Sequence, residues 1–155
     1  MNKELYFLRS SEQKIVIDMF KYAHPNNPEN LSAYTEFFGF TNKDLGLYAL
    51  VDNEIAGAIW SRRLNPDEAP RLSVAIVPKF KGKGVGSFMM DQFLQEAGAL
   101  YDALSIDISA KPNTLKFYEK FGFTKHNDTF FLTKKLEKKE LIRPNDGYDP
   151  TRWMD

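Results

Sequence analysis

Cysteine is absent from this 155-residue sequence, and histidine is scarce, occurring only as His24 and His126. The lack of cysteine excludes a disulfide-linked scaffold, a thiolate nucleophile and any zinc or iron–sulfur site with cysteine ligands. With so few histidines, a metal site would have to be built mainly from carboxylates. We therefore expect no resident metal ion.

An excess of charge of either sign is also missing, because 21 Lys and Arg residues balance 21 Asp and Glu residues. A chain with no net charge has no global field to attract nucleic acid or an anionic membrane. Lys79, Lys81 and Lys83 surround Phe80 in one short basic patch, which is too little for a nucleic-acid-binding domain. We expect neither nucleic acid nor membrane as a partner, and any anion site must be local.

Long apolar runs are missing as well. No window approaches the roughly 18 apolar residues of a membrane span, and residues 1–10, which include Lys3 and Glu4, lack the apolar run of a signal peptide. A cytoplasmic location is therefore expected. The composition, 43% hydrophobic and 27% charged, is that of a globular domain with one core.

Apolar periodicity and turn residues predict an α/β order of elements. Strands are expected at residues 4–9, 45–51, 55–62, 71–77, 103–109 and 129–133. Helices are expected from a cap at Ser10 or Ser11 to a break at 24–28, and at 31–38, 84–101 and 112–121. Consecutive strands favour antiparallel pairing, and the strand, helix, strand order over 71–109 favours one parallel crossover, so the sheet should be mixed.

The most informative segment is residues 77–87, which places three glycines and three lysines between a strand and the first turn of a helix. The first N–H groups of a helix have no intrahelical partner and lie at its positive end, so they attract anions. Glycines let the backbone approach such a ligand closely. A phosphate is the expected ligand. The alternative is a solvated loop in which the glycines are needed only for the turn conformation.

Two common phosphate-binding patterns do not fit this segment. A Walker-type loop requires GxxxxGK[ST], but Lys83 is followed by Gly84. A Rossmann turn requires a third glycine where Ser87 stands, and it requires the first glycine to follow the strand directly.

A third pattern fits better. The strand end Ile76-Val77-Pro78 and the helix start Lys81-Gly82-Lys83-Gly84-Val85-Gly86 together resemble the acetyl-CoA signature of the GNAT N-acetyltransferase superfamily, [QR]-x-x-G-x-[GA]. Downstream, residues 117–123, Phe-Tyr-Glu-Lys-Phe-Gly-Phe, are similar to that family's Y-E-K-x-G-F helix and turn. The resemblance covers residues 1–136. It implies the GNAT fold, α/β (α+β), in which helices flank a mixed, mostly antiparallel central sheet on both faces.

The same resemblance implies direct transfer of an acetyl group from acetyl-CoA to a primary amine of a small molecule or peptide, in a ternary complex. It implies a bulge that opens a slot beside the strand end, a backbone N–H near Ile76 that polarises the thioester carbonyl, and Tyr118 as the acid that protonates the departing sulfur. The residues that it assigns to cofactor binding are Ile76, Val77, Pro78, Lys81, Gly82, Lys83, Gly84, Val85, Gly86, Ser87 and Asn113.

Two positions depart from the family pattern. Lys81 stands where Gln or Arg is usual, and Lys111 stands seven residues before Tyr118, where many members have a cofactor-binding Asn. Asn113 either contacts the cofactor or caps the following helix. Lys111, together with the lack of an identifiable base, leaves open a second interpretation, a non-catalytic CoA-binding or regulatory module on the same fold.

The acceptor side is less defined. The strand 71–77 contains no carboxylate, so it offers no direct base for the amine. Segments that border the acceptor in the family contain His24, Glu36, Asp67 and Glu68, each of which is equally an ordinary surface residue. A set of aromatic residues could line an acceptor pocket or simply fill the core, namely Tyr34, Phe37, Phe38, Tyr48 and Trp60.

Composition changes after Leu136, and residues 137–155 form a tail that includes Tyr148, Trp153 and Met154. Such a tail either frays or docks on this subunit or a neighbouring one, because aromatic residues are enriched in interface cores. A homodimer would be in keeping with the family.

Overall fold

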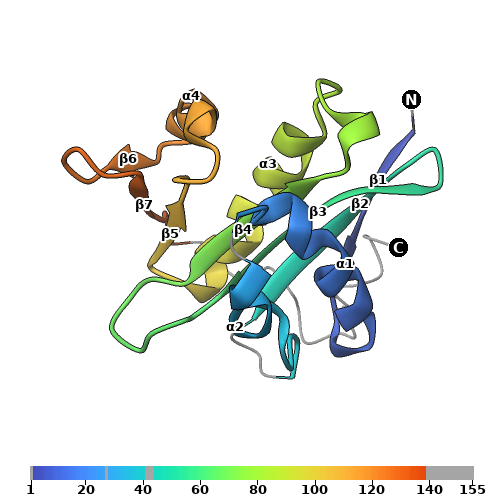
Figure 1. Ribbon diagram of the computed structural model, residues 1–155, viewed down its shortest axis with the longest axis horizontal. Helices are drawn as coiled ribbons and strands as arrows, with labels where there is room; N and C mark the ends of the chain where they lie inside the picture. The colour runs from blue at the N-terminus through green and yellow to red at the C-terminus, as the bar shows by residue number, and fades with distance from the viewer. Residues whose placement is uncertain (1, 27, 41–43, 139–155) are drawn as a thin grey trace.

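The computed structural model describes residues 2–26, 28–40 and 44–138. Its strands form one sheet in the order β1-β2-β3-β4-β5-β7-β6 (Figure 1). Their bounds are Lys3–Phe7, Leu45–Val51, Glu54–Arg62, Arg71–Ile76, Ala103–Asp107, Thr124–Lys125 and Phe131–Lys135 for β1 to β7. Neighbouring strands are antiparallel, except that β4 and β5 are parallel. The predicted mixed, mostly antiparallel sheet is confirmed.

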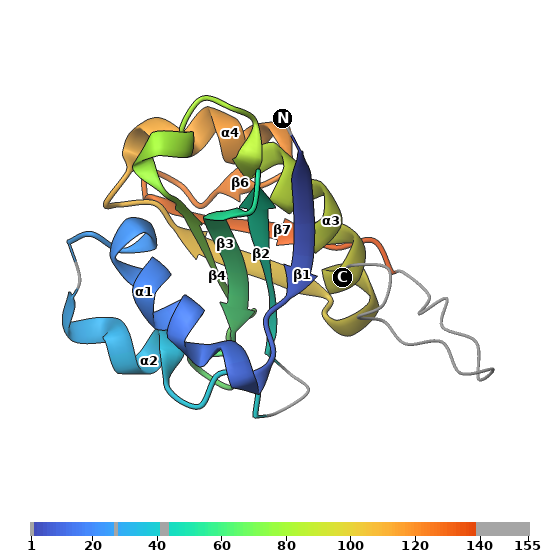
Figure 2. The same cartoon turned by 90° about the vertical axis from the view of Figure 1, so that its right-hand side faces the viewer.

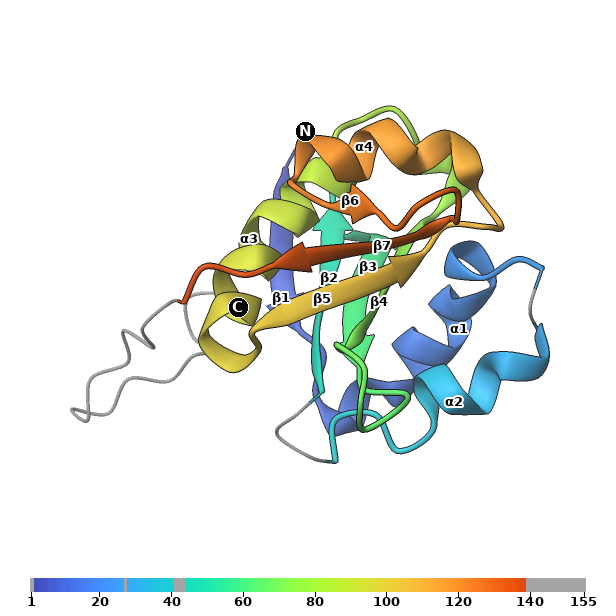
Figure 3. The same cartoon turned by 90° about the vertical axis from the view of Figure 1, so that its left-hand side faces the viewer.

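Helices cover both faces of this sheet (Figures 2 and 3). They are α1 (Gln13–Ala23), α2 (Leu31–Thr35), α3 (Val85–Leu100) and α4 (Leu115–Lys120). Because side chains alternate along a strand, β3 sends Ile59 into one core cluster with Phe93 of α3, and Trp60 into a second with Val16 of α1. All four side chains are fully buried, so the central strands are held from both sides.

A two-residue turn joins β2 to β3. Val51 pairs with Glu54, and the intervening Asp52 and Asn53 have φ of 49° and 69°. Asp and Asn tolerate this left-handed conformation better than most residues, and two such residues make the turn that matches strand twist. The predicted tight hairpin is confirmed.

The second helix is shorter than expected, because α2 ends at Thr35 rather than at residue 38. The Thr35 hydroxyl donates to the Leu31 carbonyl at 2.7 Å, and Trp60 Nε1 donates to the Tyr34 carbonyl at 3.1 Å. Phe37 then takes a φ of 56°, which turns Phe38 into the core. Burial of Phe38 therefore overrides the helical continuation that the sequence suggested.

Several other boundaries also differ from the predictions. The first helix is not capped by Ser10 or Ser11, since a 3-10 turn over Ser10–Glu12 precedes α1. The last strand is β7 at Phe131–Lys135 instead of 129–133, and the short β6 was not predicted. β6 has only two residues, and its pairing with β7 carries no apolar alternation that a sequence pattern could reveal.

Candidate functional site

The central feature of the site is the separation of β4 from β5. The two strands share one register pair, Arg71 with Ser105, at the start of β4. Beyond that pair they diverge, and no further partner joins them among the described residues. The sheet is therefore split toward the carboxyl ends of these two parallel strands (Figure 3).

Backbone groups of β4 face this split. The Val77 N–H donates to the Ala56 carbonyl on the β3 side at 2.8 Å, whereas the Pro70 carbonyl accepts from Ser105 on the β5 side at 3.0 Å. Because successive peptide groups of a strand point to opposite edges, the N–H groups of Val74 and Ile76 lie on the edge that faces the split.

The split does not depend on a bulge in β4. Pairing of β3 with β4 is continuous from Gly57 with Ile76 to Arg62 with Arg71, and the register shift lies instead between Ala49 and Leu50 on the β2 side. The bulge expected near Ile76 and Val77 is therefore absent from the paired residues of β4. Divergence of β5 alone opens the slot.

A cavity of about 680 Å³ fills the split. Its walls come from β4, β5, the loop before α3, the first turn of α3, the turn before α4, α4 itself and the end of α1. The lining residues used below are Ala23, His24, Ser73, Ile76, Lys81, Gly82, Gly84, Val85, Gly86, Ser87, Asp107, Lys111, Asn113, Phe117 and Tyr118.

The glycine-rich loop forms one end of the cavity. Gly82 and Gly84 have φ of 75° and 79°, and Gly84 is the N-cap of the 16-residue helix α3. A Cβ at Gly82 would meet nothing within 4 Å, so the space beside the loop is open to a ligand. At Gly86 a Cβ would lie 3.3 Å from the Phe117 ring, so α4 packs closely over the helix start. The pyrophosphate of CoA fits this end of the cavity, because unpaired N–H groups of the helix N-terminus and the Lys81 ammonium can bind it and no side chain blocks the loop.

Most of the predicted cofactor residues line the cavity. They are Ile76, Lys81, Gly82, Gly84, Val85, Gly86, Ser87 and Asn113. Val77, Pro78 and Lys83 do not line it. Asn113 is exposed in the 3-10 turn Pro112–Thr114, and the N-cap of α4 is Thr114, so the alternative role of Asn113 as helix cap is wrong.

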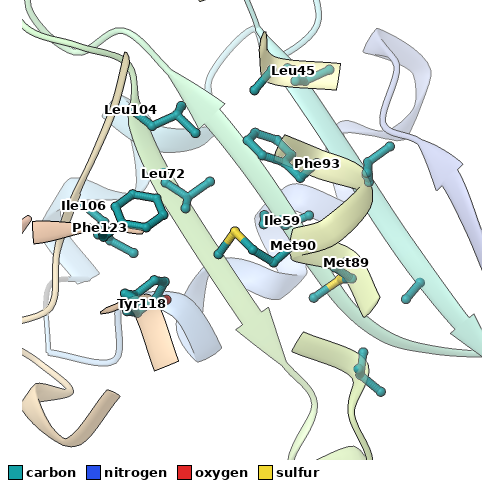
Figure 4. Packing of buried hydrophobic residues seen from close by; sticks show 14 of the residues in the cluster. Leu45, Ile59, Leu72, Met89, Met90, Phe93, Leu104, Ile106, Tyr118 and Phe123 are labelled. Atoms are coloured by element: carbon teal, nitrogen blue, oxygen red, sulfur yellow. The ribbon is translucent and has the colours of Figure 1, made fainter. Parts of the chain in front are cut away.

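Tyr118 lies on α4 with its ring packed edge-on against Phe117 and Phe123, at centroid distances of 5.1 and 5.7 Å. Figure 4 shows it beside Ile106 and Phe123. The side chain is 6% exposed and lines the cavity. Burial raises the pKa of its phenol above the ordinary value. Tyr118 is therefore a core residue that also lines the cavity, and its phenol keeps its proton at pH 7.

His24 forms the opposite wall, just after the end of α1. Its Nε2 is hydrogen-bonded to Ser73 Oγ of β4 at 2.8 Å, and its ring packs at a tilt of 36° against that of Tyr34, with 4.0 Å between the ring centroids. Burial, together with the positive charges of Lys111 and Arg71, lowers the pKa of His24 to about 4. The imidazole is thus neutral at pH 7.

Comparison with known proteins agrees with this geometry. The family described as Acetyltransferase (GNAT) domain matches residues 11–133. The chain belongs to the GNAT acetyltransferase family.

A curated relative of this GNAT domain, the spermine/spermidine N(1)-acetyltransferase of Bacillus subtilis (strain 168), is 26% identical over 142 residues, which are 89% of this chain and 84% of the relative. Two solved structures show the same fold. The ribosomal-protein-alanine N-acetyltransferase of Brucella melitensis has a TM-score of 0.67 at 17% identity and covers 85% of this chain and 99% of its own. The phosphinothricin acetyltransferase of Sinorhizobium meliloti, solved with AcCoA, has a TM-score of 0.64 at 16% identity and covers 98% of both chains.

The acceptor side of the GNAT domain differs from expectation. Of the candidate bases, only His24 lines the cavity; Glu68 instead pairs with Arg71 at 3.2 Å, and Glu36 and Asp67 lie elsewhere. None of the aromatic residues suggested for an acceptor pocket lines the described cavity. Tyr34, Phe38 and Trp60 are core residues, Tyr48 stacks on Tyr6, and Phe37 is exposed.

Lys111 is the residue that sequence reasoning undervalued. It stands in the turn after β5, lines the cavity, and its Nζ donates to the Tyr22 carbonyl near the end of α1. Its spacing from Tyr118 marked the position as cofactor-related, but only the fold shows that the side chain reaches across to α1.

In the part of the GNAT domain that the structure describes, no helix is long and apolar enough to cross a membrane.

Proposed function

We propose that this GNAT domain transfers an acetyl group from acetyl-CoA to a primary amine of a small molecule or peptide, directly and within a ternary complex. The observation that carries this proposal is the cavity itself, which runs from the glycine-rich loop through the split sheet to the end of α1. A thioester and an amine can enter such a cavity from opposite ends and meet. Holding both reactants in line supplies much of the rate gain in direct transfers.

The chain's own groups suit the cofactor end. N–H groups over residues 82–87, with Lys81, would hold the pyrophosphate, and the free edge of β4 would hold the pantetheine arm by strand-like hydrogen bonds. The Ile76 N–H on that edge would polarise the thioester carbonyl. Acetyl-CoA supplies the activated acetyl group.

Tyr118 is the proposed acid. The neutral amine nitrogen bonds to the acetyl carbon, the carbon–sulfur bond breaks, and the Tyr118 hydroxyl gives its proton to the departing sulfur. The proton that the nitrogen loses on becoming an amide returns to the Tyr118 phenolate through solvent. Ordinary pKa values of about 10 and 8.5 make this proton transfer uphill by only ~2 kcal/mol. Burial raises the pKa of the phenol, but a thiolate in the same cavity loses its hydration too, which raises the thiol pKa in the same direction.

The proton on the amine must leave before the attack. His24 is poorly suited to remove it, because its pKa is lowered to about 4. Moving a proton from an amine of pKa near 10.4 to this imidazole would cost roughly 9 kcal/mol. We infer that the amine loses its proton to bulk solvent, which at pH 7 costs only ~4.6 kcal/mol, and that the neutral His24 and Ser73 orient the amine by hydrogen bonds.

The test is thiol release from acetyl-CoA over a panel of primary amines, with calorimetric binding of CoA to the same protein. We expect CoA binding and amine-dependent thiol release. CoA binding without release for any amine in a broad panel would favour the non-catalytic module, and loss of both would contradict the cavity assignment.

A further inference from the structure

The end of the cavity next to α1 holds a cation that the proposed cofactor contacts do not explain. Lys111 extends from the turn after β5 to α1, where its Nζ donates to the Tyr22 carbonyl. Ala23 and His24, which follow Tyr22, line the cavity together with Lys111. The ammonium therefore lies at the α1 end, where the amine enters.

This ammonium has no counter-ion within the described part of the chain. No carboxylate there lies within 4.0 Å of it, and its side chain is half-buried. An ammonium has three donors, and the Tyr22 carbonyl uses one. Buried charges are normally paired, so a cation held beside a cavity without a partner indicates an anionic ligand. Burial and the nearby Lys81 lower the pKa of Lys111, which is the direction expected for a charge that lacks its partner.

The other charged residues around the cavity further restrict the chemical class of ligand that can bind there. Lys81 stands in the glycine-rich loop, from where its positive charge still acts on Lys111, and Arg71 is already paired with Glu68. Asp107 is the remaining charged residue of the described lining; one of its oxygens accepts the Ser109 N–H at 2.9 Å. The α1 end thus offers one cation and one carboxylate, which suits a molecule bearing both an anion and an amine.

We propose that the acceptor is an amine that also carries an anionic group such as a carboxylate, and that Lys111 binds this anion at the α1 end of the cavity. The inference rests on the proposed acetyl transfer and names the class of its acceptor. A polyamine would bring a second ammonium next to Lys111. The acceptor named for the Bacillus relative is therefore disfavoured for this chain.

The test compares amino acids with their primary amides and with spermidine as acceptors, using the wild type, Lys111→Met and the control Lys116→Met, which changes an exposed lysine outside the cavity. For the wild type we expect kcat/KM at least tenfold higher for the acid than for its amide. Lys111→Met should lower kcat/KM for the acid tenfold or more, leaving the amide within twofold, and Lys116→Met should leave both unchanged. A wild-type preference for the amide or spermidine, or an equal loss for acid and amide in Lys111→Met, overturns the proposal.

A second measurement does not depend on turnover. Calorimetry would compare binding of an N-acetyl amino acid and its amide to the CoA-loaded protein. We expect tighter binding of the acid, lost in Lys111→Met, with an unchanged Kd for CoA. If Lys111→Met instead weakens CoA binding and does not change the difference in affinity between the acid and the amide, Lys111 binds a cofactor phosphate and the proposal is wrong. Selective acid binding without thiol release for any amine would contradict the proposed acetyl transfer alone.

Discussion

Tyr118 and His24 face the same cavity from α4 and the end of α1, and burial moves their pKa values in opposite directions. The phenol pKa is raised and the imidazole pKa is lowered to about 4. Because burial penalises the charged form of each group, both are neutral at pH 7. The cavity is thus lined by a phenol that keeps its proton and an imidazole that does not take one.

Replacing Tyr118 by Phe removes the proposed proton donor and preserves the ring that packs against Phe117 and Phe123. We expect kcat to fall roughly tenfold or more, with the Kd for CoA unchanged, since general acid catalysis contributes about that much or more. Steady-state kinetics and calorimetry measure the two effects. Tyr101→Phe is the control, because Tyr101 is a buried tyrosine outside the cavity whose hydroxyl accepts a hydrogen bond from Ser61. Unaltered turnover in Tyr118→Phe would refute the assignment.

His24 should make the fold sensitive to acid. Its pKa is about 4 in the folded state and near 6.5 when unfolded. Below pH 6.5 the unfolded chain therefore binds the additional proton, and the free energy of unfolding should fall by about 2 kcal/mol between pH 7.5 and pH 5 through this group. His24→Gln should remove that part of the pH dependence, measured by urea unfolding at both pH values. The control His126→Gln changes an exposed histidine, and an equal effect of the two substitutions would argue against the assignment.

At the scale of elements, the loop and first turn of α3 have the most demanding backbone. Gly84 caps the helix with a φ of 79°, and a Cβ added there would lie 3.5 Å from Lys3 Nζ. A positive φ is costly in free energy for a β-branched residue. The backbone conformation of this loop therefore depends on glycine at position 84.

Gly84→Val should weaken CoA binding tenfold or more, because the valine distorts the loop and its side chain reduces access to the helix N–H groups. Calorimetry measures the affinity, and circular dichroism with a thermal melt establishes that the variant is folded. Gln95→Val adds the same residue at an exposed position of α3 and should leave the affinity unchanged. A folded Gly84→Val protein with the parent's affinity would remove the basis of the phosphate assignment.

At the scale of the whole molecule, two cores on opposite faces hold the sheet, while the split between β4 and β5 exposes backbone in its middle. A continuous sheet would bury those N–H groups in strand pairs. The free-energy cost of these unpaired N–H groups stays low because the sheet splits only beyond the pair Arg71 and Ser105. Helices α1, α3 and α4 still pack on the strands from both sides there.

The proposed domain of residues 1–136 can be tested by deleting residues 144–155. All lining residues of the described cavity lie between Ala23 and Tyr118, so we expect the truncated protein to bind CoA within twofold of the full chain. Residues 139–155 lie outside the described residues, and docking of the tail stays a prediction. A lower melting temperature of the truncated protein would support docking on the same subunit, and a change from dimer to monomer in solution would support docking on a neighbour. If neither the melting temperature nor the oligomeric state changes, that hypothesis ends.

Local sequence predicted those parts of the site that local chemistry controls. The glycines at 82, 84 and 86 and the amphipathic helix that follows them were evident from spacing, because a helix N-terminus that binds an anion needs bare backbone. The hairpin at Asp52 and Asn53 was predicted for the same reason, since the turn depends on two adjacent residues. The Tyr118 segment was identified only by its resemblance to the GNAT pattern.

The acceptor end could not be predicted, because its groups come from segments far apart in the chain. His24 meets Ser73 across 49 positions and Lys111 meets Tyr22 across 89, and no periodicity links such residues. By itself the sequence determined the family motif, the mixed character of the sheet and the glycine-rich end of the cavity. Only the tertiary structure decided which titratable groups share the other end, because burial and the charges of distant segments, not residue type, set their protonation and their partners.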